Sequence, residues 1–345
     1  SIVEQDRGRL EALGRGVARG RVLAEAACLA RDLVNEPANV MTPARLAEAA
    51  QEVAREHGLE CHVLEREEMQ RLGMNALLGV AQGSENPPRL IVLSYRGDPD
   101  TPGNNLGLLG KGVTFDSGGL SLKSANGMEE MKGDMAGGAA VIAALQAVAR
   151  LKPRINVTAV VPAVENLPGG RAQRPGDVVR AMNGKSIEVI NTDAEGRLIL
   201  ADALCYARTK LGLTRLVDVA TLTGAIVVAL GGHCSGMMGN DEGLAEQVRR
   251  AGEAAGERFW PMPMFEEYRQ QLRSSVADIK NTGGREAGAI TAALFLKEFA
   301  EDTPWVHLDI AGTFMVDKDS GYAVTGATGV PARTLVRLAL ALAGQ

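Results

Sequence analysis

Residues 191–198 read Asn-Thr-Asp-Ala-Glu-Gly-Arg-Leu, and they place two carboxylates and a guanidinium at alternate positions. Side chains two residues apart lie on the same side of an extended segment. If this stretch is extended, Asp193, Glu195 and Arg197 share one face, and a glycine turn follows the second carboxylate. Crowded carboxylates repel one another, and a bound cation removes that repulsion. The pattern therefore favours a divalent metal ion beside this segment.

A second charged region lies upstream. It comprises residues 110–123, Gly-Lys-Gly-Val-Thr-Phe-Asp-Ser-Gly-Gly-Leu-Ser-Leu-Lys, and residues 128–134, Met-Glu-Glu-Met-Lys-Gly-Asp. The apolar run 106–109 precedes it, and the strand-like run 187–190 precedes the first motif. Both runs are expected to be strands. Since ligands of open α/β sheets bind at the carboxyl ends of strands, the two charged regions are predicted to meet in one crevice.

The residue types in these regions limit the metals that the site can hold. The four histidines lie outside both regions, and no His-x-x-x-His pair occurs, so a histidine-rich zinc protease site is excluded. Oxygen ligands suit Mn²⁺, Mg²⁺ and Zn²⁺. A lysine binds metal only as the neutral amine, so its pKa must fall far below about 10.4, which two adjacent dications can bring about. The candidate ligands are Lys111, Asp116, Asp134, Asp193 and Glu195.

The same residues also allow simpler interpretations. A Walker A loop needs Gly-Lys-Ser/Thr, but Lys111 is followed by Gly112, and a Gly-x-Gly-x-x-Gly loop fails because Phe115 stands at the last position. A single acidic residue on a loop is usually only solvated, and Lys132, beside Asp134, is expected to be a solvated surface residue. The joint occurrence of both charged regions is what favours the metal site.

Two histidines outside these regions invite a functional interpretation. His307 lies in the apolar strand-like run 305–310, which is typical of a buried, hydrogen-bonded histidine, and Asp309 on the same run is a candidate partner. His233 adjoins Cys234, but neither has a second partner at ligand spacing. Neither histidine is therefore assigned to a metal site.

The sequence resembles the leucyl aminopeptidase family, the M17 metallopeptidases. The resemblance rests on the runs Gly-Lys-Gly-Val-Thr-Phe-Asp-Ser-Gly-Gly, Met-Lys-Gly-Asp-Met and Asn-Thr-Asp-Ala-Glu-Gly-Arg, of which the last is that family's signature. Similarity covers nearly the whole chain and includes residues 32–39, 220–225, 287–293, 305–312 and 326–329. The chain departs from the family at Ser124, where a proline usually follows the lysine.

The resemblance implies a role for each matching residue. It implies that one metal ion is bound by Lys111, Asp116, Asp134 and Glu195. It implies that the other is bound by Asp116, Asp193 and Glu195, with the main-chain carbonyl of Asp193. Lys123 would be the catalytic lysine, and Arg197 would hold a bicarbonate. The pocket for the first substrate side chain would be lined by Met131, Ala311 and Phe314, and main-chain groups of Leu222 and Gly224 would hold the substrate backbone.

The implied activity is release of N-terminal amino acids, preferably apolar and leucine-like, from peptides. A hydroxide bridging two divalent ions, Mn²⁺ or Zn²⁺, would attack the carbonyl carbon, and Lys123 would stabilise the charge on the carbonyl oxygen. Arg197 stays protonated, so a bicarbonate beside it would carry the proton to the leaving amine. Two alternatives stay open: a non-catalytic assembly or binding protein that retains the fold, and a phosphoester hydrolase with two metals.

Composition sets wider bounds. The 345 residues carry a net charge of -5, so no basic surface for nucleic acid is indicated. No run of about 18 apolar residues indicates a membrane span, and the charged N-terminus does not resemble a signal peptide. The four scattered cysteines fit a reducing compartment, so a cytoplasmic role in peptide catabolism is expected. The resemblance also implies a homo-oligomer, in that family a hexamer.

Strand-like and helix-like runs alternate along the chain, which predicts an α/β fold with a mixed, largely parallel central sheet and helices on both faces. Strands are expected at 90–95, 106–109, 157–161, 187–190, 216–220 and 306–310, and helices at 1–34, 42–57, 138–151 and 198–207. Residues 167–176 are expected to form an active-site loop. The resemblance divides the chain into a linker helix, 1–34, with the family's N-terminal domain absent, and a catalytic domain, 35–345.

Overall fold

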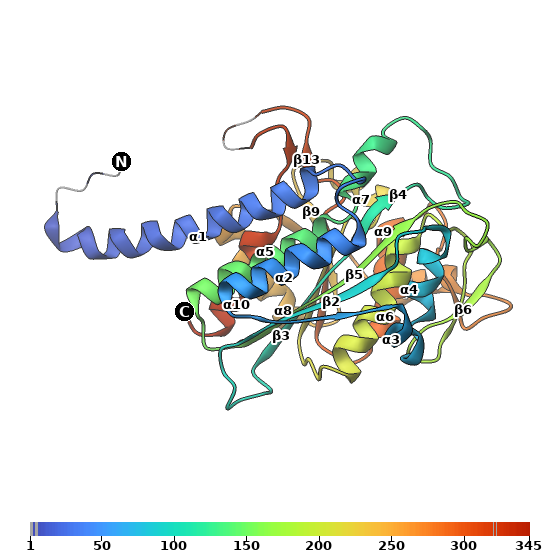
Figure 1. Ribbon diagram of the computed structural model, residues 1–345, viewed down its shortest axis with the longest axis horizontal. Coiled ribbons are helices and arrows are strands. Elements are labelled where there is room, and N and C mark those ends of the chain that lie inside the picture. The colour runs from blue at the N-terminus through green and yellow to red at the C-terminus, as the bar shows by residue number, and fades with distance from the viewer. Residues whose placement is uncertain (1–2, 4–5, 320, 322) are drawn as a thin grey trace.

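The computed structural model describes residues 3, 6–319, 321 and 323–345. Within these residues, a nine-stranded sheet crosses the molecule and helices cover both of its faces (Figure 1). The strand order is β1-β2-β5-β3-β8-β12-β9-β10, with β4 paired to β5. The strands are β1 Glu60–Leu64, β2 Arg89–Arg96, β3 Asn105–Gly110, β4 Gly112–Asp116, β5 Asn156–Asn166, β8 Leu216–Ala220, β9 Ser235–Gly239, β10 Phe259–Pro261 and β12 Trp305–Asp309.

The central strands β5, β3, β8 and β12 run parallel, and antiparallel pairs occur at β1–β2, β2–β5 and β12–β9. The predicted mixed, largely parallel sheet is therefore confirmed. The α-helices are α1 Leu10–Asn35, α2 Pro43–His57, α3 Arg66–Arg71, α4 Asn75–Val80, α5 Ala136–Leu151, α6 Glu195–Thr209, α7 Gly224–Leu230, α8 Glu242–Ala255, α9 Gly288–Ala300 and α10 Ala332–Leu342. The short 3-10 helices are η1 Arg7–Arg9, η2 Ala81–Gly83, η3 Met128–Gly133 and η4 Glu266–Leu272.

Each face of the sheet has its own apolar core. Successive side chains of a strand point to opposite faces, so β2 gives Ile91 and Leu93 to one core and Leu90 and Val92 to the other. The first core is closed by α1, α2, α5, α8 and α10, and the second by α3, α4, α6 and α9. Because both faces are covered, the central strands are mostly apolar, as expected for a parallel sheet, and the exceptions include Asp218, His307 and Asp309.

The strand predicted at 187–190 does not belong to the central sheet. Its residues form β7 (Ser186–Glu188), which pairs with β6 (Val178–Arg180) and β11 (Ile279–Lys280) in a separate three-stranded sheet. A short apolar run predicts a strand but contains no information about which strands it joins. The remaining predicted strands are confirmed and belong to the central sheet. A further two-stranded sheet pairs β13 (Met315–Val316) with β14 (Gly326–Ala327).

The segment 191–198 is not extended, so the predicted alternation of its charged side chains is wrong. Helix α6 begins at Glu195 and contains Gly196 and Arg197. Gly196 is thus a helical residue and not part of a turn. A Cβ atom at Gly196 would lie 2.7 Å from Cε of Lys111, so this glycine leaves room for the lysine side chain to cross the start of the helix.

Helix α5 packs unusually close to the sheet. A Cβ atom at Gly137 would lie 2.0 Å from the Val219 carbonyl oxygen, and one at Gly138 would lie 2.7 Å from Val161 Cγ1. The amide of Gly138 donates to the Lys111 carbonyl oxygen at 2.8 Å, so the helix start fixes the main chain of Lys111. The stretch Met128–Leu151 is long and apolar enough to cross a membrane, but 83% of its apolar window is buried inside this protein.

Helix α2 matches the helix expected at 42–57, and α1 matches the helix expected at 1–34 only from Leu10 onward. Residues 3 and 6 are not helical, residues 7–9 form η1, and residues 1–2 and 4–5 lie outside the described residues. Thr42 caps α2 by accepting from the Arg45 amide at 3.3 Å, with Pro43 at the first helical position. The C-terminal part of α1 packs on α5, where Glu25 pairs with Arg150, whereas its N-terminal part projects beyond the body (Figure 1). The division of the chain at residue 34 stays a prediction.

Asp202, in the middle of α6, is a fully buried carboxyl group. Its two oxygens accept from the Leu77 amide at 2.9 Å and the Met182 amide at 2.8 Å, so it ties α6 to α4 and to the loop after β6. Burial raises the pKa of Asp202 to about 7, and the N–H donors offset only part of this effect. The unfolded chain releases the same proton near pH 4.

We expect the stability of the fold to fall as the pH rises from about 4 to about 7, because the folded protein holds this proton more tightly than the unfolded chain does. The contribution is at most ~4 kcal/mol. The test compares urea unfolding of the wild type and Asp202→Asn between about pH 5 and pH 8, where the difference isolates this group. A difference in unfolding free energy that is constant over this range would contradict the expectation.

Candidate metal centre and substrate cleft

The two charged regions meet where several strands of the central sheet end and α6 begins. Lys111 lies between β3 and β4, Asp116 ends β4, and Asp134 follows η3. Glu195 is the first residue of α6, and Asp193 lies two residues before it, in the turn that precedes the helix. The predicted meeting of the two regions is therefore confirmed by the contacts between their side chains, although β7 does not belong to the central sheet.

Lys111 holds the inner half of the cluster. Its ammonium lies 2.7 Å from Asp134 Oδ1 and 2.7 Å from Glu195 Oε1, and it donates to the Thr221 carbonyl oxygen at 3.0 Å. The Thr221 hydroxyl donates to Asp134 Oδ1 at 2.7 Å. All three charged side chains are buried. The loop after β8 is thus linked directly to this half of the cluster.

Lys123 holds the outer half. Its ammonium lies 2.8 Å from Asp116 Oδ2 and 2.5 Å from Asp193 Oδ1. The other Asp116 oxygen accepts from the Gly118 amide at 2.9 Å and from Asn166 Nδ2 at 2.7 Å. Lys123 is the more accessible of the two lysines, because 23% of its side chain is exposed, whereas only 3% of the Lys111 side chain is exposed. It is therefore the lysine with room to turn toward a bound molecule.

Asn166 is a site residue that sequence reasoning missed. It ends β5, and its amide nitrogen donates both to Asp116 and to the Thr192 carbonyl oxygen at 3.0 Å. Thr192 in turn exchanges hydrogen bonds with Ser121 and donates its hydroxyl to the Gly118 carbonyl oxygen at 2.6 Å. These bonds fasten the segment before α6 to the loop after β4. No signal in the sequence indicated it, because the strand predicted at 157–161 stops short of Asn166, whereas β5 continues to that residue.

The cluster contains four carboxylates and two ammonium groups, an excess of two negative charges in a largely buried region. Oxygen atoms of Asp116, Asp193 and Glu195 all lie within 4.8 Å of one another. The buried atoms Asp134 Oδ2 and Glu195 Oε2 have no hydrogen-bond partner among the described residues. Buried charges without partners are costly. The residues therefore fit divalent cations, which would supply both the missing charge and the missing contacts.

The pKa values of the cluster follow the same pattern. Burial raises the pKa of Asp134, and burial together with the Asp116 carboxylate raises the pKa of Glu195 and of Asp193. Burial alone would lower the pKa of Lys111, but Asp134 and Glu195 outweigh it and raise that pKa. The protein groups alone therefore keep Lys111 charged. A neutral, ligating Lys111 requires bound cations and stays a prediction.

Arg197 lies in the first turn of α6, and it lines the same cavity as Asp193. Its Nη1 donates to the Asn281 carbonyl oxygen at 2.7 Å, whereas its buried Nε has no partner among the described residues. Burial lowers the pKa of Arg197 to about 10, and Glu195 and Asp309 partly offset this shift. The guanidinium therefore remains charged at neutral pH and has a donor left for an anion.

An open cavity of about 560 Å³ adjoins Asp193 and Arg197. Its lining includes Leu222 and Gly224, two of the residues expected to hold substrate. The apolar part of the lining consists of Leu222, Ala225, Val228, Ala229, Met262, Ala287, Ala289 and Ile290. A chain with an apolar side chain can therefore lie beside the charged cluster.

Met131, Ala311 and Phe314 do not line this cavity. Met131 belongs to η3, and that short helix packs on Phe314, since a Cβ atom at Gly133 would lie 2.4 Å from Phe314 Cε2. Ala311 follows β12, and its amide donates to Asp309 at 3.3 Å. The assignment of these residues to a pocket for the first substrate side chain stays a prediction.

Comparison with known proteins decides the family. The model for the catalytic domain of the cytosol aminopeptidase family matches residues 28–336. The chain belongs to this family. Two relatives, each named "Probable cytosol aminopeptidase", come from Solibacter usitatus and Alkaliphilus metalliredigens. The first is 61% identical over 98% of this chain and 70% of its own length, and the second is 53% identical over 98% and 67%.

Solved structures agree with the family assignment. The bottromycin maturation enzyme BotP superposes with a TM-score of 0.89 and 45% identity, covering 96% of this chain and 72% of that one. A structure of BotP in complex with Mn gives a TM-score of 0.90 and 46% identity over 95% and 72%. The cytosol aminopeptidase family consists of metallo-exopeptidases, so this chain is classed as a hydrolase that acts on peptides and uses divalent metal ions.

His307 is a buried core histidine, as expected, but its partner is not Asp309. Its Nδ1 lies 2.6 Å from Asp218 Oδ1 on the neighbouring strand β8, and Asp218 also accepts from Trp305 Nε1 at 2.6 Å. His307 and Asp309 project from the same face of β12, two residues apart, so the cross-strand neighbour is nearer than the residue along the strand. His307 thus belongs to the interior and not to the charged cluster.

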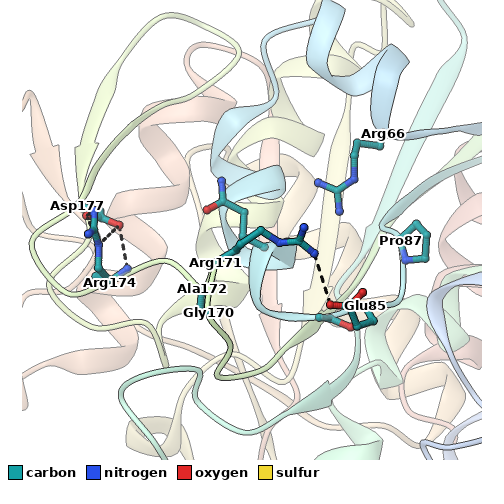
Figure 2. A pocket seen from close by; sticks show the side chains of 10 residues that line it. Arg66, Glu85, Pro87, Gly170, Arg171, Ala172, Arg174 and Asp177 are labelled. Atoms are coloured by element: carbon teal, nitrogen blue, oxygen red, sulfur yellow. Dashed lines mark hydrogen bonds and ion pairs between the residues drawn. The ribbon is translucent and has the colours of Figure 1, made fainter.

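The loop 167–176 does not line the aminopeptidase cleft. Gly170, Arg171 and Arg174 line a separate cavity together with Arg66 and Glu85 (Figure 2). In Figure 2, Arg171 points across this cavity to Glu85, at 3.4 Å. The expectation of an active-site loop is therefore wrong, because proline and glycine content predicts a loop but not the cavity that the loop borders.

Proposed function

We propose that this chain is a two-metal aminopeptidase that releases N-terminal residues from peptides, with apolar, leucine-like residues preferred. The observation that carries this proposal is the buried cluster of four carboxylates and two lysines. Its excess of negative charge and its two unpartnered carboxylate oxygens support bound divalent cations. The non-catalytic alternative is not favoured, because a scaffold gains nothing from so costly a cluster.

We assign the two metal positions on the donors present. One position would be held by Lys111, Asp116, Asp134 and Glu195, and the other by Asp116, Asp193 and Glu195. When bound, a pair of Mn²⁺ or Zn²⁺ ions would lower the pKa of a bound water molecule and would act as a Lewis acid that polarises a carbonyl group. The Mn complex of BotP, at 46% identity, supports manganese as one of the candidate ions.

The side chains around the metals have separate tasks in this proposal. Lys123, released from Asp116 and Asp193, would donate to the carbonyl oxygen of the scissile peptide, where negative charge develops. Arg197 would use its free Nε to hold a bicarbonate, which supplies a proton-transfer group that a permanently charged guanidinium cannot supply. Met131 and Ala311 would border the first substrate side chain.

The apolar lining of the cleft supports the preference for apolar substrates. A peptide beside Arg197 would contact Leu222, Val228 and Met262. Burying an apolar substrate side chain there contributes roughly 1.5–3 kcal/mol, so peptides that place an apolar side chain in this cavity should be favoured.

A homo-oligomer, in this family expected to be a hexamer, and a cytoplasmic location are part of the same proposal. Val228, Trp260 and Phe265 are large apolar residues that are mostly exposed on the surface, at 90%, 62% and 61%. A second copy of the chain that covers Trp260 or Phe265 would bury apolar area that is now exposed. The cysteines Cys28, Cys61, Cys205 and Cys234 are free thiols, which is consistent with a reducing compartment.

Metal removal tests the proposed function. After treatment with a chelator, we expect release of p-nitroaniline from leucine p-nitroanilide to stop, because the cations supply the nucleophile and the electrophile. Addition of Mn²⁺ or Zn²⁺ should restore it. The controls are the circular dichroism spectrum of the stripped protein, metal content by mass spectrometry, and p-nitrophenyl phosphate as substrate. A folded protein that binds two ions but stays inactive, or prefers the phosphate ester, would overturn the proposal.

A further inference from the structure

Asp309, the last residue of β12, accepts hydrogen bonds from main-chain groups of two loops beside the substrate cleft. Its side chain is fully buried. Oδ1 accepts from the Leu222 amide at 3.1 Å and from the Ala311 amide at 3.3 Å, and Oδ2 accepts from the Thr223 hydroxyl at 2.7 Å. One carboxylate therefore holds the loop after β8 and the loop after β12 together.

The position of Asp309 follows from the sheet. Strands β12 and β8 are parallel, and Asp309 pairs in register with Ala220. Both strands therefore end at the same level, and the residues that follow them leave the sheet side by side. Because the loop bonds span 86 and 87 residues of chain, only the folded sheet brings these groups together.

The loop that Asp309 holds contacts the charged cluster at one end and lines the substrate cleft at the other. At one end, Thr221 contacts Lys111 and Asp134 of the charged cluster. At the other end, Leu222 and Gly224 line the cleft. Thr223 also caps α7 by accepting from the Ile226 amide at 3.1 Å. A shift of this short loop would therefore move the cleft relative to the cluster.

These hydrogen bonds also decide which main-chain groups a peptide can use. The Leu222 amide is occupied by Asp309, so Leu222 can offer its carbonyl oxygen as an acceptor. Gly224 is the first residue of α7, and N–H groups in the first turn of a helix have no acceptor within the helix. The loop thus presents an acceptor at Leu222 and a donor at Gly224, a pair that matches the main chain of a peptide.

We propose that Asp309 is a positioning residue for peptide binding, which fixes the Leu222 carbonyl and the Gly224 amide without touching the substrate or the metals. This inference rests on the proposed aminopeptidase function. Burying a carboxylate costs free energy unless hydrogen bonds compensate for the lost hydration. Here all three hydrogen bonds come from groups of the two loops. The charge of Asp309 is not required for this task, since the oxygen of an asparagine amide can accept from the same two amides.

The test compares Asp309→Ala and Asp309→Asn with a matched control. Asp218→Asn is suitable, because Asp218 is equally buried on the adjacent strand but bonds Trp305 and His307 and not the loops. For Asp309→Ala we expect KM for leucine p-nitroanilide to rise about 10- to 100-fold, with kcat changed less. For Asp309→Asn and Asp218→Asn we expect KM within about threefold of the wild type.

Two further measurements do not depend on turnover. Hydrogen exchange of the segment 221–225 should accelerate in Asp309→Ala and stay slow in Asp309→Asn and Asp218→Asn. The number of bound Mn²⁺ ions should be the same in all variants. An unchanged KM and unchanged exchange in Asp309→Ala, or an Asp309→Asn as impaired as Asp309→Ala, would overturn the inference. If the wild type is inactive but the variants show the expected differences in exchange, the proposed function alone is overturned.

Discussion

Replacing Glu195 with glutamine is expected to lower kcat by at least about 10³-fold while the fold survives. Glu195, like Asp116, is assigned to both metal positions, and its Oε2 is buried without a hydrogen-bond partner among the described residues. Glutamine has the same size but contributes a neutral amide, so the site loses a negative charge that the cations need. The measurement is leucine p-nitroanilide turnover with added Mn²⁺, together with the number of bound ions per chain.

The matched control for this variant is Glu257→Gln. Glu257 is also buried, but it pairs with Arg333 at 3.1 Å and accepts from the Thr334 amide near the start of α10, and none of these three residues lines the cleft. This control should lose thermal stability and keep its kcat. Turnover of Glu195→Gln within about tenfold of the wild type would contradict the assignment of Glu195 as a metal ligand.

Replacing Lys123 with methionine is expected to lower kcat by about 10²–10³-fold with a much smaller effect on KM. Lys123 is proposed to stabilise charge that develops on the peptide carbonyl oxygen only during the reaction. Methionine keeps an unbranched side chain of similar length but has no ammonium group. The measurement is kcat and KM for leucine p-nitroanilide at saturating Mn²⁺.

Lys132→Met serves as the control, because the Lys132 ammonium donates to the Asn35 carbonyl oxygen at 2.5 Å and does not join the cluster. It should behave as the wild type does. The count of bound ions should be unchanged in Lys123→Met, since Lys123 is not assigned as a ligand. A large loss of bound Mn²⁺ in this variant, or a kcat equal to that of the control, would show that Lys123 has another role.

Local sequence patterns determined much of the architecture. The apolar runs of the central strands, the cap of α2 at Thr42 and the small residues of α5 each depend on neighbours within a few positions, so they can be read along the chain. The same is true of the types of charged residue available for a metal site. The family signature in 191–198 then implied which of these residues act together.

The tertiary structure decided how those residues meet. The segment 191–198 was predicted to place its charges by alternation, yet α6 begins at Glu195, and long-range hydrogen bonds from Asn166 fix the segment instead. The partner of His307 and the separate sheet of β7 could not be predicted for the same reason.

The physical cause is the range of the interactions. Hydrophobic periodicity and capping act within a turn or a strand, whereas the site depends on the order in which strands pair. The bond from Lys111 to Thr221 spans 110 residues, and it exists because β3 and β8 are parallel neighbours in the sheet. The sequence by itself therefore determined the chemical groups and the local elements, and only the strand order placed Asp309, Asn166 and Thr221 around the cleft.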